Sequence, residues 1–321
     1  KPLKLWFFNF PTQLTTLSFK ITILGSSGAL PAYGRHPASQ LVEIQNRSFL
    51  VDCGEGAQMQ LMRLQVNFHR INHIFISHLH GDHYLGLMGL IFTMHLQRRV
   101  NDLHLYSHRG LDEIITTHLR YSRSSPGFKI IFHLLEKGVK EVIFEDEALT
   151  VETIPLAHKI RCSGFLFKEK TKPRRIDKTR LPQGLPLQQV AGLKNGNDVR
   201  DETGAILYTN ESLTFEPRKS RSYAYCSDTV FDEGLVDQIR SIDLLYHEAT
   251  FMTDEESKAK DTKHSTAKQA AMIAKLAAVN RLLLGHFSAR YKDLTPILDE
   301  AKSIFVNTEL AIEGEEFIIQ D

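Results

Sequence analysis

The segment His78-Leu-His-Gly-Asp-His83 places three imidazoles and one carboxylate within six residues, one residue after the apolar stretch His73–Ile76. Imidazole nitrogen and carboxylate oxygen are the ligands that zinc and its neighbours prefer. His78 and His80 project to the same side of an extended turn, because side chains alternate with period two. Gly81 lets the chain bend tightly, so the segment can divide its ligands between two metals. A polar loop of unrelated histidines explains the pattern poorly, and we expect a metal-dependent hydrolase.

The bulk composition is that of an ordinary globular protein. The 321 residues are 42% hydrophobic and 24% charged, with a net charge of +1 and a pI of about 7.9, so any basic surface must be local. Three scattered cysteines without CxxC spacing argue against a disulfide framework and favour a cytoplasmic protein. No apolar run approaches the roughly 20 residues needed to cross a bilayer, so we expect no membrane association.

The N-terminal residues 1–18 read as an extension, native or added, that precedes the fold. The catalytic domain is expected over residues 19–321. Within it, strand-like and helix-like segments alternate. The expected strands are Phe19–Leu24, Leu41–Ile44, Phe49–Val51, His73–Ile76, Leu103–Tyr106, Lys129–Leu134, Val139–Phe144, Leu149–Ile154, Gly164–Phe167, Ser222–Cys226, Asp243–His247 and Arg281–Leu284, with Leu310–Ile312 and Phe317–Ile319 as a closing pair. The expected helices are Ala57–Val66, His83–Arg98, Gly110–Tyr121, Glu233–Ile239, Ser265–Ala278 with Ser265 as its cap, and Thr295–Ser303.

Residues 168–220 interrupt this alternation. The stretch is rich in Lys, Arg, Pro, Gly, Asn and Asp and poor in apolar residues, so we expect no core of its own. Its length of about fifty residues is far beyond an ordinary loop. It is either a disordered insertion or an arm with a function.

Three further ligand candidates follow apolar strands: His158 in Pro155-Leu-Ala-His158, Asp228 in Cys226-Ser-Asp-Thr229, and His286 in Leu284-Gly-His-Phe287. Loop tips after strands are where scaffolded active sites are built. Taken alone, each of the three would more often be structural. Their common position at strand ends, together with the six-residue segment, makes all three metal-ligand candidates.

The order of these residues resembles the metallo-β-lactamase superfamily, beginning with Asp52-Cys-Gly-Glu55 and ending at His286. The elements His247-Glu-Ala-Thr250 and His264-Ser-Thr266 make it similar to the tRNase Z family of endonucleases that mature tRNA 3′ ends. Ser26-Ser-Gly-Ala-Leu-Pro31 and His286-Phe-Ser-Ala-Arg-Tyr291 add to this resemblance, which runs from about Phe19 to the C-terminus.

The resemblance implies an α/β fold, an αββα sandwich of two mixed sheets flanked by helices, with an inserted flexible arm. It also implies two Zn²⁺ ions per subunit, although nitrogen and oxygen ligands serve Mn²⁺ and Fe²⁺ as well. By the family pattern, one ion is held by His78, His80 and His158, the other by Asp82, His83 and His286, and both by Asp228. Two metals about 3.5–4 Å apart can activate water and hold phosphate oxygens.

Phosphodiester cleavage also needs a proton for the departing 3′ oxygen. Glu248 and His264 fit this need, with the carboxylate orienting an imidazole that acts as general acid; the alternative is a structural salt bridge. Asp82 is either a ligand only or also a partner of the nucleophilic water. Asp52 either hydrogen-bonds a ligand histidine and fixes its tautomer or merely caps a turn. His247 is expected to be a packed strand residue.

A local basic cluster indicates the substrate. Nine basic and two acidic residues lie between Lys159 and Arg180, a pattern typical of a phosphate-binding patch. The resemblance implies an arm that clamps precursor tRNA, in homodimers where one subunit's arm serves the other's active site. The expected RNA contacts are Lys170, Lys172, Arg174, Arg175, Lys178, Arg180 and Arg290, although Arg290 could equally pair with a surface carboxylate. The rival interpretations are a small-molecule phosphodiesterase or arylsulfatase of the same superfamily, and a catalytically silent RNA-binding protein.

Overall fold

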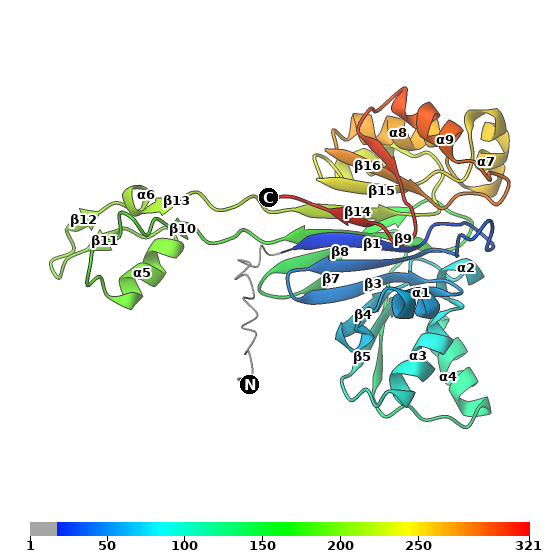
Figure 1. Ribbon diagram of the computed structural model, residues 1–321, viewed down its shortest axis with the longest axis horizontal. Helices are drawn as coiled ribbons and strands as arrows, with labels where there is room; N and C mark the ends of the chain where they lie inside the picture. The colour runs from blue at the N-terminus through cyan, green and yellow to red at the C-terminus, as the bar shows by residue number, and fades with distance from the viewer. Residues whose placement is uncertain (1–17) are drawn as a thin grey trace, which may run out of the picture.

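The computed structural model describes residues 18–321 as two seven-stranded mixed sheets packed face to face, with helices on the outer face of each sheet (Figure 1). The expected N-terminal extension lies outside the described residues, apart from Ser18. The αββα sandwich expected from the sequence is confirmed. Among residues 18–321, no helix has the length and apolar character needed to cross a membrane.

The first sheet has the order β18-β1-β2-β3-β4-β5-β6 and combines antiparallel pairs at one side with parallel pairs from β3 to β6. Its strands are β1 (Phe19–Gly25), β2 (Ser39–Ile44), β3 (Arg47–Cys53), β4 (Ile71–Phe75), β5 (Leu103–Ser107), β6 (Ile130–Leu134) and β18 (Glu316–Ile318).

The second sheet has the order β17-β16-β15-β14-β9-β8-β7, with parallel pairing from β14 to β17. Its strands are β7 (Val142–Glu145), β8 (Leu149–Leu156), β9 (Cys162–Glu169), β14 (Ser222–Cys226), β15 (Leu244–Glu248), β16 (Arg281–Gly285) and β17 (Thr308–Leu310). The carboxyl ends of the parallel strands of both sheets reach the same edge of the sandwich, and this edge carries the loops of the candidate site.

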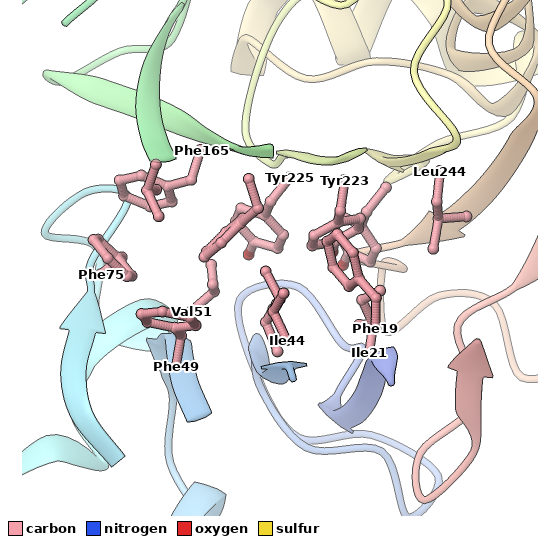
Figure 2. Packing of buried hydrophobic residues seen from close by; sticks show 14 of the residues in the cluster. Phe19, Ile21, Ile44, Phe49, Val51, Phe75, Phe165, Tyr223, Tyr225 and Leu244 are labelled. Atoms are coloured by element: carbon pink, nitrogen blue, oxygen red, sulfur yellow. The ribbon is translucent and has the colours of Figure 1, made fainter. Parts of the chain in front are cut away.

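Three apolar layers hold the sandwich together. Between the sheets, aromatic and branched side chains such as Phe49, Phe75, Phe165 and Tyr223 interdigitate (Figure 2). A second layer lies between the first sheet and its helices, and a third between the second sheet and its helices. The first sheet is covered by α1 (Ala57–Arg63), α2 (Gly81–Tyr84), α3 (Leu87–Leu96), α4 (Leu111–Tyr121) and the 3₁₀ turn η1 (Phe68–Arg70). The second is covered by η2 (Glu233–Gln238), η3 (Thr253–Glu255), α7 (Glu256–Thr262), α8 (Ala267–Leu276) and α9 (Thr295–Lys302).

Three local expectations were wrong. The expected helix His83–Arg98 is split into α2 and α3, because the N–H of Gly86 donates to the carbonyl of Cys53 (2.9 Å). The expected helix Glu233–Ile239 is the 3₁₀ turn η2. Thr266, not Ser265, caps α8 in a capping box with Gln269, while the Ser265 hydroxyl donates to the Thr229 carbonyl (2.7 Å).

The expected closing strand pair was also wrong, because its two members belong to different sheets. β17 pairs with β16 of the second sheet, whereas β18 pairs with β1 of the first. The turn between them therefore connects the two sheets at one end of the sandwich. Glu313 lies in this turn.

Residues 170–220 form a lobe that projects from the end of the sandwich opposite to α2 (Figure 1). The lobe contains β10 (Arg175–Ile176), α5 (Leu187–Lys194), β11 (Val199–Arg200), β12 (Ile206–Tyr208), α6 (Asn210–Leu213) and β13 (Thr214–Phe215). Leu193, Val199 and Leu213 are buried within it, at most 3% exposed. The expectation of no core was therefore wrong: three scattered apolar residues suffice for a small one.

Candidate metal centre

The candidate ligands come from four separate segments that meet at one edge of the sandwich. His78, His80, Asp82 and His83 follow β4 and continue into α2, while His158 follows β8. Asp228 follows β14 and His286 follows β16, both with positive φ angles (59° and 56°) that turn the chain sharply at the strand end. The fold thus brings together every residue that the sequence singled out as a ligand.

One group of donors consists of His78, His80, His158 and Asp228. Nδ1 of His80 lies 2.9 Å from Nε2 of His78 and 3.2 Å from Nε2 of His158. Nε2 of His78 lies 3.0 Å from Oδ2 of Asp228. Four donor atoms therefore face one another around a common point.

A second group consists of Asp82, His83 and His286. Nε2 of His83 lies 3.3 Å from Nε2 of His286, and each of these nitrogens lies 3.4 Å from Oδ2 of Asp82. Asp228 contacts this group as well: its Oδ2 lies 2.8 Å from Nε2 of His83, and its Oδ1 lies 3.2 Å from Nε2 of His286. Asp228 thus stands between the two groups.

These separations fit divalent metal ions. A tetrahedral ion with metal–nitrogen bonds of 2.0–2.1 Å has neighbouring ligand atoms about 3.3 Å apart, close to the observed spacing. Oδ1 of Asp228 is buried and makes no hydrogen bond within residues 18–321, although Nε2 of His286 and Nδ1 of His264 each lie 3.2 Å from it. Within residues 18–321, no Lys or Arg forms a salt bridge with Asp82 or Asp228. Buried carboxylates need compensating positive charge, and the cluster can supply it by binding metal ions.

The partners of the distal ring nitrogens orient three of the imidazoles. Nδ1 of His83 lies 2.7 Å from Oδ2 of Asp52, Nδ1 of His286 lies 2.9 Å from Oγ1 of Thr250, and Nδ1 of His158 lies 2.8 Å from the carbonyl of Lys263. In each ring the proton on Nδ1 leaves Nε2 with its lone pair toward the donor group.

Asp52 is completely buried and accepts hydrogen bonds from several donors. The N–H of Ser77 donates to Oδ1 (2.7 Å), and the hydroxyls of Ser77 (2.8 Å) and Tyr225 (2.7 Å) donate to Oδ2, beside Nδ1 of His83. These contacts agree with the proposal that Asp52 orients a ligand histidine, not with a simple turn cap.

Charges within the cluster shift its pKa values strongly. Burial alone would raise the pKa of Asp228, but the imidazoles of His286, His83 and His78 hold it well below its usual range. Burial lowers the pKa of His78 to about 4, with the charge of His83 acting in the same direction. His78 is therefore neutral at physiological pH, as a metal ligand must be.

The predicted pair Glu248 and His264 lies beside the donor groups. Nδ1 of His264 is 3.0 Å from Oε1 of Glu248 and 3.2 Å from Oδ1 of Asp228. Glu248 is fully buried, and its carboxylate accepts hydrogen bonds from the N–H of Thr229 (2.7 Å) and the hydroxyl of Thr250 (2.5 Å). Burial opposes protonation of His264, but the charges of Glu248 and Asp228 raise its pKa to about 10. The metal-free site therefore keeps this imidazole protonated at neutral pH.

A pocket of about 550 Å³ opens onto this cluster. His80, Asp82, His264 and His286 line its floor, and Arg290 is among the residues of its wall. The guanidinium of Arg290 pairs with Glu255 and lies 5.1 Å from the centre of the Phe251 ring. A volume of this size can hold a phosphodiester group beside these side chains.

The other predicted RNA-contact residues lie at the projecting lobe, away from this pocket. Most of them are engaged in ion pairs: Lys170 with Glu145, Lys172 with Glu169 and Asp321, Arg174 with Glu216, and Arg180 with Asp177. Arg175 lies over the ring of Phe215 (5.4 Å), and Lys178 is exposed without a salt bridge to any residue in 18–321.

Sequence reasoning gave no role to Thr250, Ser77, Tyr225 or the carbonyl of Lys263. Thr250 could have been suspected, because it lies in the same four-residue element as Glu248. The other three had no signal in the sequence. His247 is buried and donates from Nδ1 to the Glu248 carbonyl (2.8 Å), so it packs within β15 as expected.

Known proteins resemble the chain over nearly its full length. A family model described as Anti-Pycsar protein Apyc1 matches residues 19–172, which end before Asp228, Glu248 and His264. Ribonuclease Z of Bacteroides fragilis strain YCH46 is 46% identical over 92% of this chain and 97% of that protein. Ribonuclease Z of Cytophaga hutchinsonii is 48% identical over 95% of this chain and 97% of that protein.

Among solved structures, human tRNase Z, short form, is similar with a TM-score of 0.68 and 27% identity, covering 94% of this chain and 100% of that one. Identity above 40% across both halves of the sandwich and the intervening lobe exceeds what a shared fold alone requires. The chain therefore belongs to the ribonuclease Z family.

Proposed function

We propose that the protein is a metal-dependent endoribonuclease that removes the 3′ trailer from precursor tRNA. It cuts just after the discriminator base and leaves a 3′-hydroxyl on the tRNA. The observation that carries this proposal is the contact between Glu248 and His264 at the edge of the candidate metal centre. Family membership and the printed names of the relatives support the choice of RNA as substrate.

Two Zn²⁺ ions per subunit are the proposed cofactors, and Mn²⁺ or Fe²⁺ would suit the same donors. His78, His80 and His158 would hold one ion; Asp82, His83 and His286 would hold the other, and Asp228 would contact both. When bound, the ions supply a hydrolytic nucleophile at neutral pH and offset the charge of the phosphate oxygens.

His264 completes the reaction as the proton donor. Its Nδ1 is held by Glu248, so Nε2 is the nitrogen free to give a proton to the departing 3′ oxygen. Cations held by Asp228 would offset that carboxylate's charge and lower the pKa of His264 from its high metal-free value. A pKa nearer neutrality favours general-acid catalysis. A ribose oxygen is a poor leaving group, which is why this substrate class requires such a donor.

The projecting lobe, residues 170–220, is proposed to bind the body of the tRNA. It leaves the sandwich at the ends of β9 and β14 that lie away from the candidate centre (Figure 1). β9 alone spans eight residues, about 26 Å at 3.3 Å per residue. We therefore propose a homodimer in which the lobe of one subunit serves the pocket of its partner. Lys178 and Arg180 are exposed on the lobe; Lys178 has no salt bridge within residues 18–321, whereas Arg180 would exchange its contact with Asp177 (3.4 Å) for an RNA phosphate.

We further propose a cytoplasmic location. Cys53, Cys162 and Cys226 are free and buried, as expected in a reducing compartment.

The alternative activity is that of a small-molecule phosphodiesterase or arylsulfatase. The partial match to the family model described as Anti-Pycsar protein Apyc1 covers the six-residue segment and His158, so this part of the donor set is not particular to the ribonuclease Z family. Glu248, His264 and most of the lobe lie outside that match. A substrate with a good leaving group requires neither the proton donor nor a long basic lobe, so this alternative explains less of the chain.

The test is incubation of the protein with a 3′-extended precursor tRNA, with the cut site mapped and a chelator as control. We expect one cut after the discriminator base and no cleavage in chelator. Deletion of residues 170–219 should impair this cleavage and spare hydrolysis of bis(p-nitrophenyl) phosphate. Absence of a defined cut by the metal-loaded protein would refute the proposed function, and equal loss on both substrates would make the lobe structural.

A further inference from the structure

One wall of the pocket is a loop between β1 and β2, residues 26–36, which we call the rim loop. It touches two residues of the candidate centre. The backbone N–H of Ala29 donates to Oδ2 of Asp82 (2.7 Å). Gly28 lies against the ring of His286 so closely that a Cβ atom at this position would be 2.7 Å from Cε1. The position of the rim loop therefore affects how Asp82 and His286 face the donor group.

The two ends of the rim loop are joined by a carboxylate from the other end of the chain. Oε1 of Glu313 accepts hydrogen bonds from the N–H of Ser26 (3.3 Å) and from the N–H of His36 (2.5 Å). Its Oε2 lies 2.8 Å from Nδ1 of His36 and accepts a hydrogen bond from Nε2 of Gln60 (2.8 Å). The Glu313 side chain is only 10% exposed and Ser26 is buried, whereas the His36 side chain is 33% exposed.

We propose that Glu313 is a positioning residue for hydrolysis: it fixes the rim loop so that Ala29 and Gly28 hold Asp82 and His286 in place. Glu313 lies in the turn between β17 and β18, the turn that connects the two sheets. Its carboxylate thus ties the loop at the pocket to the connection between the two sheets. The inference rests on the proposed function, because it assigns Glu313 to the same hydrolytic centre.

Other contacts of the rim loop do not replace this one. Gly28 donates to the carbonyl of Phe287 and Phe287 to that of Ser26 (2.9 Å each), which fixes the β1 side of the loop. On the β2 side, Arg35 donates to the carbonyl of Tyr291 (2.6 Å) from a flexible side chain. Glu313 alone, within the described residues, accepts hydrogen bonds from the backbone at both ends. The N–H of Ser27 also donates to the carbonyl of His36 (2.9 Å), so the two ends share one direct backbone hydrogen bond. Loss of the Glu313 carboxylate leaves the N–H groups of Ser26 and His36 without this acceptor and removes the link between both ends and the turn that carries Glu313.

The experiment compares Glu313→Ala and Glu313→Gln with Glu315→Ala, a matched control. Glu315 is an exposed residue of the same turn, and its side chain makes no hydrogen bond or salt bridge within residues 18–321. Turnover of bis(p-nitrophenyl) phosphate is measured per folded protein, and Co²⁺ is titrated into the metal-free proteins while its visible absorption is recorded. The Asp82→Asn variant is titrated in the same way, and the Co²⁺ ion whose binding it weakens is the one that depends on Asp82.

We expect Glu313→Ala to lower kcat at least tenfold with KM within twofold, and to weaken the Asp82-dependent Co²⁺ equivalent at least tenfold. Glu313→Gln, which keeps one acceptor oxygen, should lose less, and Glu315→Ala should match the unmodified protein. The inference is overturned if kcat and Co²⁺ affinity of Glu313→Ala stay within twofold of the control, or if its activity falls only as its folded fraction falls. Should Glu313→Ala not fold, unchanged values for Glu313→Gln overturn it equally. Failure of the protein to cleave precursor tRNA would refute the proposed function. The two measurements made here, turnover of bis(p-nitrophenyl) phosphate and Co²⁺ affinity, would still test the role of Glu313.

Discussion

Replacing Asp52 by Asn tests whether a buried carboxylate sets the tautomer of a metal-binding imidazole. The change is nearly isosteric, but it converts one acceptor oxygen into an NH₂ donor. If the new NH₂ replaces Oδ2, it faces Nδ1 of His83 at 2.7 Å. To accept a hydrogen bond from that NH₂, His83 must move its proton from Nδ1 to Nε2. Nε2 is the nitrogen that lies among Asp82, Asp228 and His286, so the protonated ring no longer offers it a lone pair.

The size of the effect follows from the same contacts. The new NH₂ group has two hydrogens, so with one donated to Nδ1 of His83 only one of the Ser77 and Tyr225 hydroxyls can rotate to accept the other. The main loss is one charge-assisted hydrogen bond, about 1.5–3 kcal/mol. Loss of such an orienting partner typically weakens metal binding 10–100-fold, about 1.4–2.8 kcal/mol. The two estimates agree.

The assay is a metal-affinity titration of Asp52→Asn beside Asp299→Asn, an exposed control on α9 with no side-chain hydrogen bond to any residue in 18–321. We expect Asp52→Asn to bind the more weakly held of its metal ions with 10–100-fold lower affinity than the unmodified protein. NMR of labelled imidazoles should show the Nε2–H tautomer of His83. Unchanged affinity together with an Nδ1–H tautomer would refute the reasoning.

Three further predictions concern the centre and the substrate. His80→Ala should abolish cleavage and lower the metal content measured by elemental analysis, because His80 faces both His78 and His158; normal turnover would contradict the dinuclear centre. Gly28→Ala should destabilise the fold by about 1–3 kcal/mol in chemical denaturation and reduce turnover, because the added methyl displaces the His286 ring; an unchanged rate would show that the ring is not held there. Raising salt from about 50 to 200 mM should weaken precursor-tRNA binding by orders of magnitude, as measured by filter binding, and a flat response would rule out an electrostatic clamp.

The sequence predicted the sheets and the donor residues well because both rest on local chemistry. Buried strands show as apolar runs, and ligands show as His and Asp placed where those runs end. The closing strands were assigned to the wrong partners because strand pairing does not rest on local chemistry. Residues 308–318 contain two short strands joined by a turn with Gly314, a pattern that is compatible with a hairpin. Strand partners are set by long-range contacts, such as the bond from the N–H of Ala311 to the carbonyl of Leu284, and these leave no local signal.

The lobe was misjudged on similar grounds. Its low apolar content argued against any core, yet Leu193, Val199 and Leu213 meet because two short β-ladders fold the chain back on itself. The lobe's basic residues were read correctly as a local cluster, but the sequence could not reveal that several pair with carboxylates at its base. For that reason Lys178, which has no such partner among the described residues, is a better candidate for RNA contact than Lys172, which has two.

The orientation of the ligands is the part of the site that no local pattern carries. Each of the three best-oriented imidazoles has its Nδ1 partner on a different element: Asp52 on β3 for His83, Thr250 after β15 for His286, and the Lys263 carbonyl after α7 for His158. Thr250 connects two functions, because its hydroxyl donates to Glu248 while it accepts from His286. One hydroxyl group therefore contacts both the carboxylate beside His264, the proposed proton donor, and the proposed metal ligand His286. A change in one contact must disturb the other, so the two halves of the proposed reaction depend on the same packed edge of the sandwich.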